Sequence, residues 1–329
     1  MSRLLLGTLL SLCALAVAAA AAIAFGGPGT PAPMSSINDP FRGVDYTALP
    51  AASTFRARDG APLAYRAYRP DGVRKGSVVL VHGSSARGSS MHVLARAFAA
   101  AGYAAYALDI RGHGESGTKG QIGYIGQLDD DVEDFVRSVR PARPATLAGF
   151  SSGGGFALRI AAGERQKLFD NYLLLSPFIS QDAPTYRPNS GGWVQVGMPR
   201  YVAIGVLHVL GLRAFDDLPV TRFALNDAAR ALLTPQYSFA LAQNFRPRAD
   251  WRASIRATGQ PMRLLAGSDD EAFHAERFAG VFKAEGKDVP VTVLPGLGHI
   301  AMTLDPAAVR AAVAAVQDMD TSPAPLAMR

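Results

Sequence analysis

Residues 145–163 read ATLAGFSSGGGFALRIAAG, and this stretch decides the fold. The apolar run 145–149 predicts a strand, and residues 153–163 predict a helix. Between them, residues 149–153 (GFSSG) match G-x-S-x-G, a sharp strand-to-helix turn that lifts the serine hydroxyl out of the backbone. The flanking glycines leave room where a Cβ would collide. Only Ser151 is in frame, so it is the candidate nucleophile; the alternative is an ordinary serine at a glycine-rich helix start.

Strands and helices alternate on both sides of this turn. The other predicted strands are 53–58, 63–69, 76–81, 103–110, 172–175, 262–266 and 289–294, and the other predicted helices are 91–101, 129–139, 271–285 and 306–318. Most of these strands are continuous apolar runs rather than alternating ones. The pattern predicts an α/β fold with a mostly parallel central sheet that helices cover on both faces.

A serine nucleophile needs a histidine to take its proton and a carboxylate to orient that histidine. His299 lies in a glycine-bracketed loop directly after strand 289–294, downstream of the serine, where none of the other five histidines lies. The acid is expected after strand 262–266, where Asp269, Asp270 and Glu271 stand in a row. Spacing from the serine does not choose among these three carboxylates, and acids at a helix start also have a purely structural use.

The motifs together resemble the serine aminopeptidase and monoglyceride-lipase-like branch of the α/β-hydrolases. They are VHGSS (81–85), LDIRGHGES (108–116), GFSSG (149–153), GSDDE (267–271) and GH (298–299), in the order that the family has. The resemblance covers about residues 53–317 and implies Asp270 as the acid, with Asp269 as the fallback. It also implies that the backbone N–H groups of Ser84 and Ser152 form the oxyanion hole.

Two further polar motifs are assigned structural roles. Residues 109–114 (DIRGHG) are expected to form a loop organised by Arg111 and His113. The acidic run 129–134 could suggest a cation site, but consecutive carboxylates on a helix point in different directions. We therefore expect a solvated helix start there. Residues 177–260 alternate poorly and, by the resemblance, form a helical cap inserted after the sixth strand, in which Trp193 and Phe178 are candidates to line the substrate cavity.

The N-terminus is a separate element. Residues 4–25 are uncharged and long enough to cross a bilayer, and they follow a basic start at Arg3. A cleaved signal peptide and a retained membrane anchor both fit, and a buried core helix is the third alternative. The positive-inside rule exports the rest of the chain in either of the first two cases. The predicted divisions are a segment 1–25, a flexible linker 26–45, a hydrolase domain 46–318 and a tail 319–329.

Composition excludes several other classes of protein. The 329 residues carry 33 Lys and Arg against 27 Asp and Glu, so the formal net charge is +6. The cations are scattered singly, which argues against nucleic-acid binding, and Cys13 is the single cysteine. No metal or cofactor is implied, and the oligomeric state is not predicted.

The sequence therefore predicts an exported or membrane-anchored serine hydrolase that cleaves acyl esters, in the manner of a lipase, lysophospholipase or esterase. Ser151, Asp270 and His299 would act through an acyl-enzyme. A peptidase or amidase of the same branch is the first alternative. A catalytically silent α/β-hydrolase that serves as a binding protein is the second.

Overall fold

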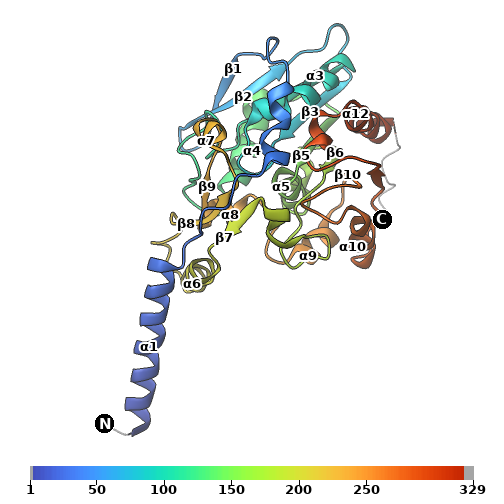
Figure 1. Ribbon diagram of the computed structural model, residues 1–329. Helices are drawn as coiled ribbons and strands as arrows, with labels where there is room; N and C mark the ends of the chain where they lie inside the picture. The colour runs from blue at the N-terminus through green and yellow to red at the C-terminus, as the bar shows by residue number, and fades with distance from the viewer. Residues whose placement is uncertain (1–2, 322–329) are drawn as a thin grey trace.

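The computed structural model describes residues 3–321, and an eight-stranded sheet forms its centre (Figure 1). The strand order is β1-β2-β4-β3-β5-β6-β10-β11; β1 and β2 are antiparallel to their neighbours, and the other pairs are parallel. The strands are β1 (Ala52–Arg56), β2 (Pro62–Tyr68), β3 (Gly76–Val81), β4 (Tyr103–Leu108), β5 (Ala145–Phe150), β6 (Asn171–Leu175), β10 (Met262–Gly267) and β11 (Val291–Leu294). The predicted mostly parallel sheet is confirmed.

Helices cover both faces of this sheet. Helices α3 and α12 pack together on one face, and α5 with α9 packs on the other, beside β5 and β6. The helices of the hydrolase core are α3 (His92–Ala100), α4 (Gln127–Val139), α5 (Ser152–Ala161), α9 (Trp251–Ala257), α10 (Phe278–Ala284), α11 (Ala301–Leu304) and α12 (Pro306–Thr321). Helix α12 runs into the predicted tail 319–329, of which residues 322–329 lie outside the described residues.

The chain between β6 and β10 forms an insertion that is not purely helical. It contains helices α6 (Met198–Val209), α7 (Asp227–Leu232) and α8 (Phe239–Asn244), besides α9. It also contains a three-stranded antiparallel sheet of β7 (Val194–Val196), β8 (Pro219–Phe223) and β9 (Gln236–Ser238). The helical cap was implied by the family resemblance, and strands of three to five residues leave too short an apolar pattern to be predicted.

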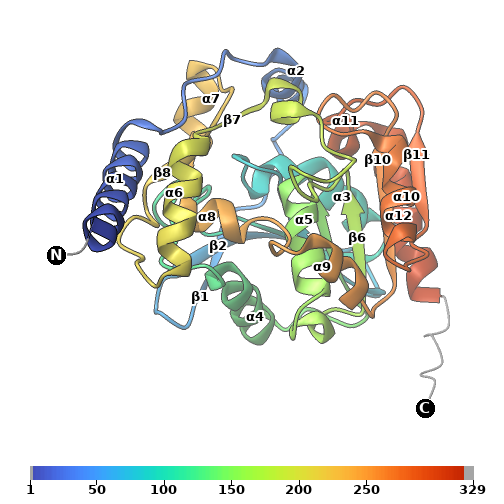
Figure 2. The same ribbon diagram turned by 90° about the horizontal axis from the view of Figure 1, so that it is seen from below.

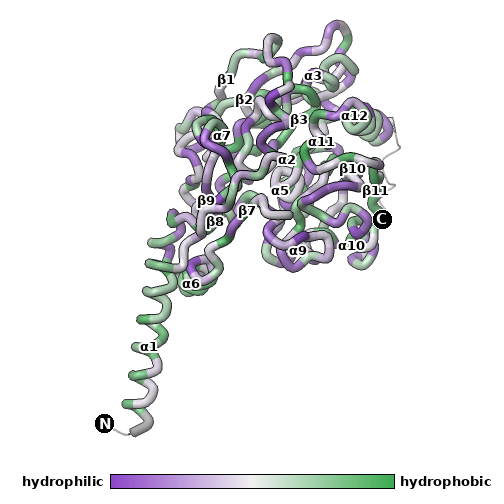
Figure 3. Tube along the Cα trace, viewed as in Figure 1, coloured by the Kyte–Doolittle hydropathy of each residue, from purple (hydrophilic) through white to green (hydrophobic). Residues whose placement is uncertain are grey.

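Helix α1 (Arg3–Phe25) projects from the globular body, and its C-terminal end lies beside α6 (Figures 1 and 2). Its residues Leu5–Phe25 have a mean hydropathy of 2.3 and are almost entirely exposed, so by length and composition this helix can cross a membrane. Figure 3 shows the apolar character along the projecting helix. Exposure of nearly the whole segment contradicts the alternative of a buried core helix.

The end of α1 is attached to the body. Ile23 packs in a small apolar cluster with Ile204, Val220 and Phe239. The Arg200 guanidinium donates to the carbonyl oxygens of Ile23 at 2.7 Å and of Ala24 at 3.1 Å. These bonds satisfy carbonyl groups that the last turn of a helix leaves without intrahelical partners.

The segment predicted as a flexible linker contains two short helical turns and contacts the globular body. A short helix α2 (Ser35–Asn38) is followed by a 3₁₀ turn at Pro40–Gly43. The side chain of Ile37 is buried in the main core, and the Asn38 amide donates to the carbonyl oxygen of Ala224 at 2.8 Å. These contacts lie C-terminal to the Gly/Pro-rich residues 26–33, whose flexibility stays a prediction.

Two core segments also differ from prediction. The helix expected over 271–285 begins only at Phe278, because residues 271–274 form a turn held by the carboxylate of Asp270. The acidic start of α4 is not solvated, since three of its carboxylates are buried in ion pairs with arginines. The pairs are Asp129–Arg159, Asp131–Arg111 and Asp134–Arg58.

Candidate active site

Ser151 stands on the turn between β5 and α5. Its backbone has φ 56° and ψ −118°, a conformation that a residue other than glycine adopts only under strain. A Cβ on Gly149 would come within 2.1 Å of the carbonyl oxygen of Gly153, and a Cβ on Gly153 within 2.4 Å of the carbonyl oxygen of His82. Both glycines are therefore required by close backbone approach, as the motif predicted.

The structure brings Ser151, His299 and Asp270 together. The His299 Nε2 lies 3.0 Å from the Ser151 Oγ, and the His299 Nδ1 lies 2.9 Å from the Asp270 Oδ2. The three side chains come from loops after β5, β11 and β10, and all three are buried. Asp269 does not reach the histidine, since its exposed carboxylate accepts from the Ser268 hydroxyl.

The surroundings of Asp270 favour its ionised form. Burial raises the pKa of this carboxyl, but the charge of His299 and the hydrogen bonds that Asp270 accepts together leave the pKa below its ordinary value. The backbone N–H groups of Ala272 and Phe273 also donate to its Oδ1. The next acid, Glu271, accepts from the backbone N–H of His299 at 2.8 Å and so positions the histidine loop. Sequence analysis had grouped Glu271 with the candidate acids without finding this role.

Ser84 and Ser152, the residues expected to form the oxyanion hole, lie at the site with Ser151. Both residues line a cavity that contains Ser151, and neither N–H has a hydrogen-bond acceptor among residues 3–321. Gly83 allows this approach, because a Cβ there would lie 3.2 Å from the Ser151 Cβ. The Ser84 hydroxyl accepts from the Trp193 indole at 2.9 Å, which ties the loop after β3 to the insertion.

A second contact holds the same loop. The Tyr237 hydroxyl accepts from the backbone N–H of Ser85 at 2.6 Å and donates to the His113 Nε2 at 2.6 Å. Burial lowers the pKa values of His113 and its neighbour His82, so both rings are neutral at pH 7. Arg111 pairs with Asp131, and the structural role predicted for the loop at 109–114 is confirmed.

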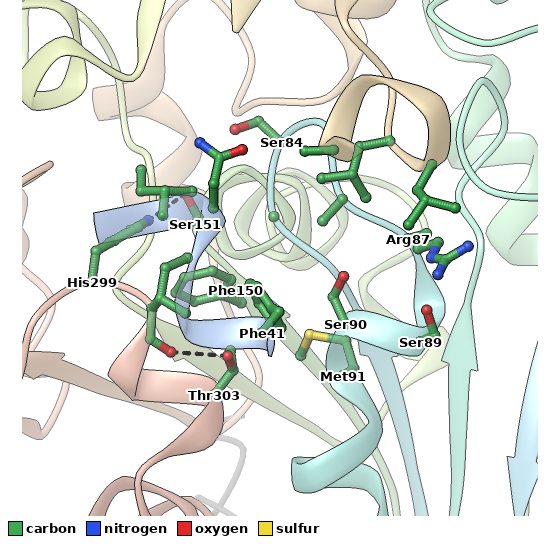
Figure 4. Close-up of a pocket in the computed structure, with 18 of the residues that line it drawn as sticks. Phe41, Ser84, Arg87, Ser89, Ser90, Met91, Phe150, Ser151, His299 and Thr303 are labelled. Atoms are coloured by element: carbon green, nitrogen blue, oxygen red, sulfur yellow. Dashed lines mark hydrogen bonds between the residues drawn. The ribbon is translucent and has the colours of Figure 1, made fainter. Parts of the chain in front are cut away.

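The larger of two cavities at Ser151 has a volume of about 280 Å³ and a mostly apolar wall. The N-terminal segment supplies part of this wall through Ile37 and Phe41, which sequence analysis did not predict. Figure 4 shows Ser151 and His299 at one end of the cavity and Arg87 at the other. The remaining apolar lining comes mainly from Met91, Phe150, Ala228, Leu232, Leu233 and Ile300.

The smaller cavity has a volume of about 70 Å³ and also contains Ser151 and His299. The insertion provides most of its lining, including Phe178 and Trp193, the two aromatic residues named as candidates. Several polar side chains line it as well, among them Gln181, Tyr201 and Arg246. Within the described part of the chain, no group of three or more His, Cys, Asp and Glu side chains is placed to hold a metal ion.

A serine on a strand-to-helix turn, with its acid and histidine after later strands of a mostly parallel sheet, defines the α/β-hydrolase class. The chain belongs to the serine aminopeptidase S33 family, whose family model matches residues 72–306. The predicted resemblance is thereby confirmed.

One relative is similar to this chain in sequence, and two solved structures are similar to it in fold. A stretch of 66 residues is 42% identical to a monoacylglycerol lipase of Mycolicibacterium smegmatis; it covers 20% of this chain and 24% of that lipase. The fold is similar to that of a monoglyceride lipase from Saccharomyces cerevisiae, with 19% identity, a TM-score of 0.62, and 84% and 96% of the two chains covered. A membrane phospholipase A described as a bacterial virulence factor is 18% identical, with a TM-score of 0.57 and coverage of 98% and 100%.

Proposed function

We propose that this protein is a serine hydrolase that cleaves carboxylic esters through an acyl-enzyme. The hydrogen-bonded chain from Ser151 through His299 to Asp270, at the junction of two cavities, carries the proposal. His299 takes the proton of Ser151 as the hydroxyl attacks the ester carbonyl, and Asp270 holds the imidazole and stabilises its charged form. His299 then passes the proton to the leaving alcohol.

The N–H groups of Ser84 and Ser152, which have no acceptor among the described residues, would stabilise the oxyanion in this reaction. Because these donors are fixed by the loop after β3 and by the start of α5, they would not need to reorganise as the charge develops. Water activated by His299 would attack the acyl-enzyme in the second half-reaction, which releases the acid and restores Ser151.

The larger cavity supports acyl chains of moderate to long length as the substrate. Its apolar lining buries methylene groups, each of which contributes about 0.8 kcal/mol when removed from water. Similarity to monoacylglycerol lipase over part of the chain agrees with a lipid ester.

Fluorophosphonate labelling tests the assignment of the nucleophile. We expect the wild-type protein and Ser152→Ala to react, because Ser152 contributes only its backbone, and Ser151→Ala to remain unlabelled. An unlabelled wild-type protein would instead support a catalytically silent binding protein.

The family description favours a peptidase or amidase as a second candidate. Rates on p-nitrophenyl esters of two to twelve carbons, compared with rates on aminoacyl arylamides, distinguish the two. Ester hydrolysis that increases with chain length supports the proposal, and preferential arylamide cleavage supports the second candidate.

We further propose that α1 is retained as a membrane anchor and that the hydrolase domain lies outside the cytoplasm. Packing of Ile23 against the insertion and the bonds from Arg200 make the end of α1 part of the folded body. An alkaline wash of membranes should leave the protein in the pellet with an N-terminus that includes residues 3–25. Release of a shorter chain would support a cleaved signal peptide.

A further inference from the structure

Arg246 is a buried cation on the wall of the smaller cavity. It follows α8, and 7% of its surface is exposed. Its Nη1 donates to the Gln181 Oε1 at 3.0 Å and to the Tyr201 hydroxyl at 3.3 Å, and its Nη2 donates to the Ser180 hydroxyl at 3.3 Å. The guanidinium carbon lies 5.8 Å from the centre of the Phe178 ring. All of these protein partners are uncharged.

The Nε of Arg246 is buried and has no hydrogen-bond partner among residues 3–321. This distinguishes Arg246 from the other two arginines that are comparably buried there. Arg111 donates to Asp131 and Arg159 donates to Asp129, each through a carboxylate that is itself buried. Arg246 forms no ion pair with any described carboxylate.

A buried guanidinium without a direct anionic partner is unfavourable, because it has lost hydration and reaches the charge of Asp182 through the Ser180 hydroxyl rather than by an ion pair. Arg246 lines the same cavity as Ser151 and His299. The larger, mostly apolar cavity suits the acyl chain, so the smaller cavity is left for the alcohol part of the ester. An anionic group on that alcohol would supply the missing charge.

We propose that Arg246 forms a subsite for an oxyanion, a phosphate or a carboxylate, on the alcohol part of the ester substrate. This proposal rests on the proposed ester hydrolase function. The cavity volume of about 70 Å³, a quarter of that of the larger cavity, suits a compact charged group. Gln181 and Tyr201 orient the guanidinium, and its fork presents several donors to one anion.

Matched short-chain esters test the subsite with the full-length protein in detergent. The neutral substrate is 1-hexanoylglycerol; the charged substrates are 1-hexanoylglycerol 3-phosphate and hexanoyl-lactate. We expect the wild-type kcat/KM to be about tenfold higher or more for at least one charged ester, because hydrogen bonds to charged groups are the stronger class. The preferred ester identifies phosphate or carboxylate as the anion. Equal rates on all three esters would overturn the proposal.

Arg246→Gln removes the charge and keeps a polar side chain. We expect it to lower the ratio of charged-ester to neutral-ester kcat/KM by about 10- to 100-fold, mainly through KM. Arg246→Lys should retain part of the ratio. Arg256→Gln is the matched control, since its exposed side chain pairs with Glu285 and lines neither cavity, and it should leave the ratio unchanged. The subsite would be contradicted if Arg246→Gln lowered kcat/KM equally for charged and neutral esters. It would also be contradicted if Arg246→Lys no longer preferred the charged esters.

A measurement on the wild-type protein decides the question if the Arg246 variants do not fold. Hexyl phosphate should inhibit hydrolysis of the neutral ester competitively at a concentration at least about tenfold lower than hexanol does. Equal potency of the two inhibitors would overturn the subsite. Failure of the proposed function itself would look different, because the wild-type protein would then hydrolyse none of the esters.

Discussion

The loops at the ends of β5, β10 and β11 and the walls of the two cavities are built from different kinds of chain. The loops follow buried strands and carry the serine, acid and histidine. The walls come largely from residues 37–46, from residues 83–91 after β3 and from the insertion. The comparison separates two properties of the enzyme. A change in the loops should alter the rate for every ester, whereas a change in the walls should alter the ratio between esters.

The largest effect is expected from Ser151→Ala. Loss of the nucleophile should lower kcat by about 10⁴- to 10⁶-fold and by the same factor for short and long esters. Ser152→Ala should change kcat little, because its side chain is not used. Steady-state rates across a chain-length series measure both variants; a loss that depends on chain length would break the comparison.

Asp270→Asn should be the next most damaging change. Without the carboxylate the imidazole loses its orienting partner, so we expect kcat to fall by about 10³- to 10⁴-fold. The matched variant Asp269→Asn should lie within about threefold of wild type, since that exposed side chain bonds Ser268. If Asp269→Asn proves the slower enzyme, the histidine is oriented differently in solution.

Phe41→Ala tests the wall that the N-terminal segment supplies. It should lower the ratio of octanoyl-ester to acetyl-ester kcat/KM by about tenfold, because an acyl chain loses an apolar contact that acetate never makes. Phe215→Ala, which changes a partly exposed phenylalanine outside both cavities, is the control and should leave the ratio unchanged. A uniform loss on both esters would place Phe41 with the catalytic loops instead.

The last prediction concerns the pH dependence of stability, which two buried histidines near the contact between the loop after β3 and the insertion should produce. Because burial lowers the pKa values of His82 and His113, the unfolded chain binds protons below about pH 6.5 that the folded protein does not. The free energy of unfolding should therefore fall with decreasing pH, by up to about 1.4 kcal/mol per pH unit for each imidazole. Thermal unfolding at pH 7.5 and 5.5 measures this loss, and His113→Gln should reduce it. An unchanged pH dependence in that variant would contradict the assignment to His113.

The loops could be predicted because their chemistry has fixed local requirements. The glycines around Ser151 are required because a Cβ at either position would collide with nearby backbone. His299 follows a recognisable strand. Sequence spacing could not choose among Asp269, Asp270 and Glu271. The choice depends on which side chain turns inward, and the resemblance to the family, rather than the residues themselves, indicated Asp270.

Apart from Phe178 and Trp193, which were expected to line the cavity, the walls could not be predicted, because their residues act through contacts distant in sequence. Ile37 and Asn38 follow a Gly/Pro-rich stretch and are ordered by the core and by Ala224. Arg246 is one arginine among many in the sequence. What distinguishes it is that its side chain is buried, has an Nε without a hydrogen-bond partner and forms no ion pair with a described carboxylate. Such features depend on tertiary structure and leave no periodic pattern.

The bonds from Arg200 to the end of α1 have a mechanical consequence. They fix the orientation of α1 relative to the hydrolase domain, which a Gly/Pro-rich connection alone would leave free to rotate. A helix of 23 residues is a lever of about 35 Å. With α1 in a bilayer, hydrophobic mismatch sets the tilt of this lever. If α1 is retained as the proposed anchor, a thinner bilayer that tilts α1 would also turn the hydrolase domain, so the thickness of the surrounding lipid would set the angle at which the cavities face the membrane.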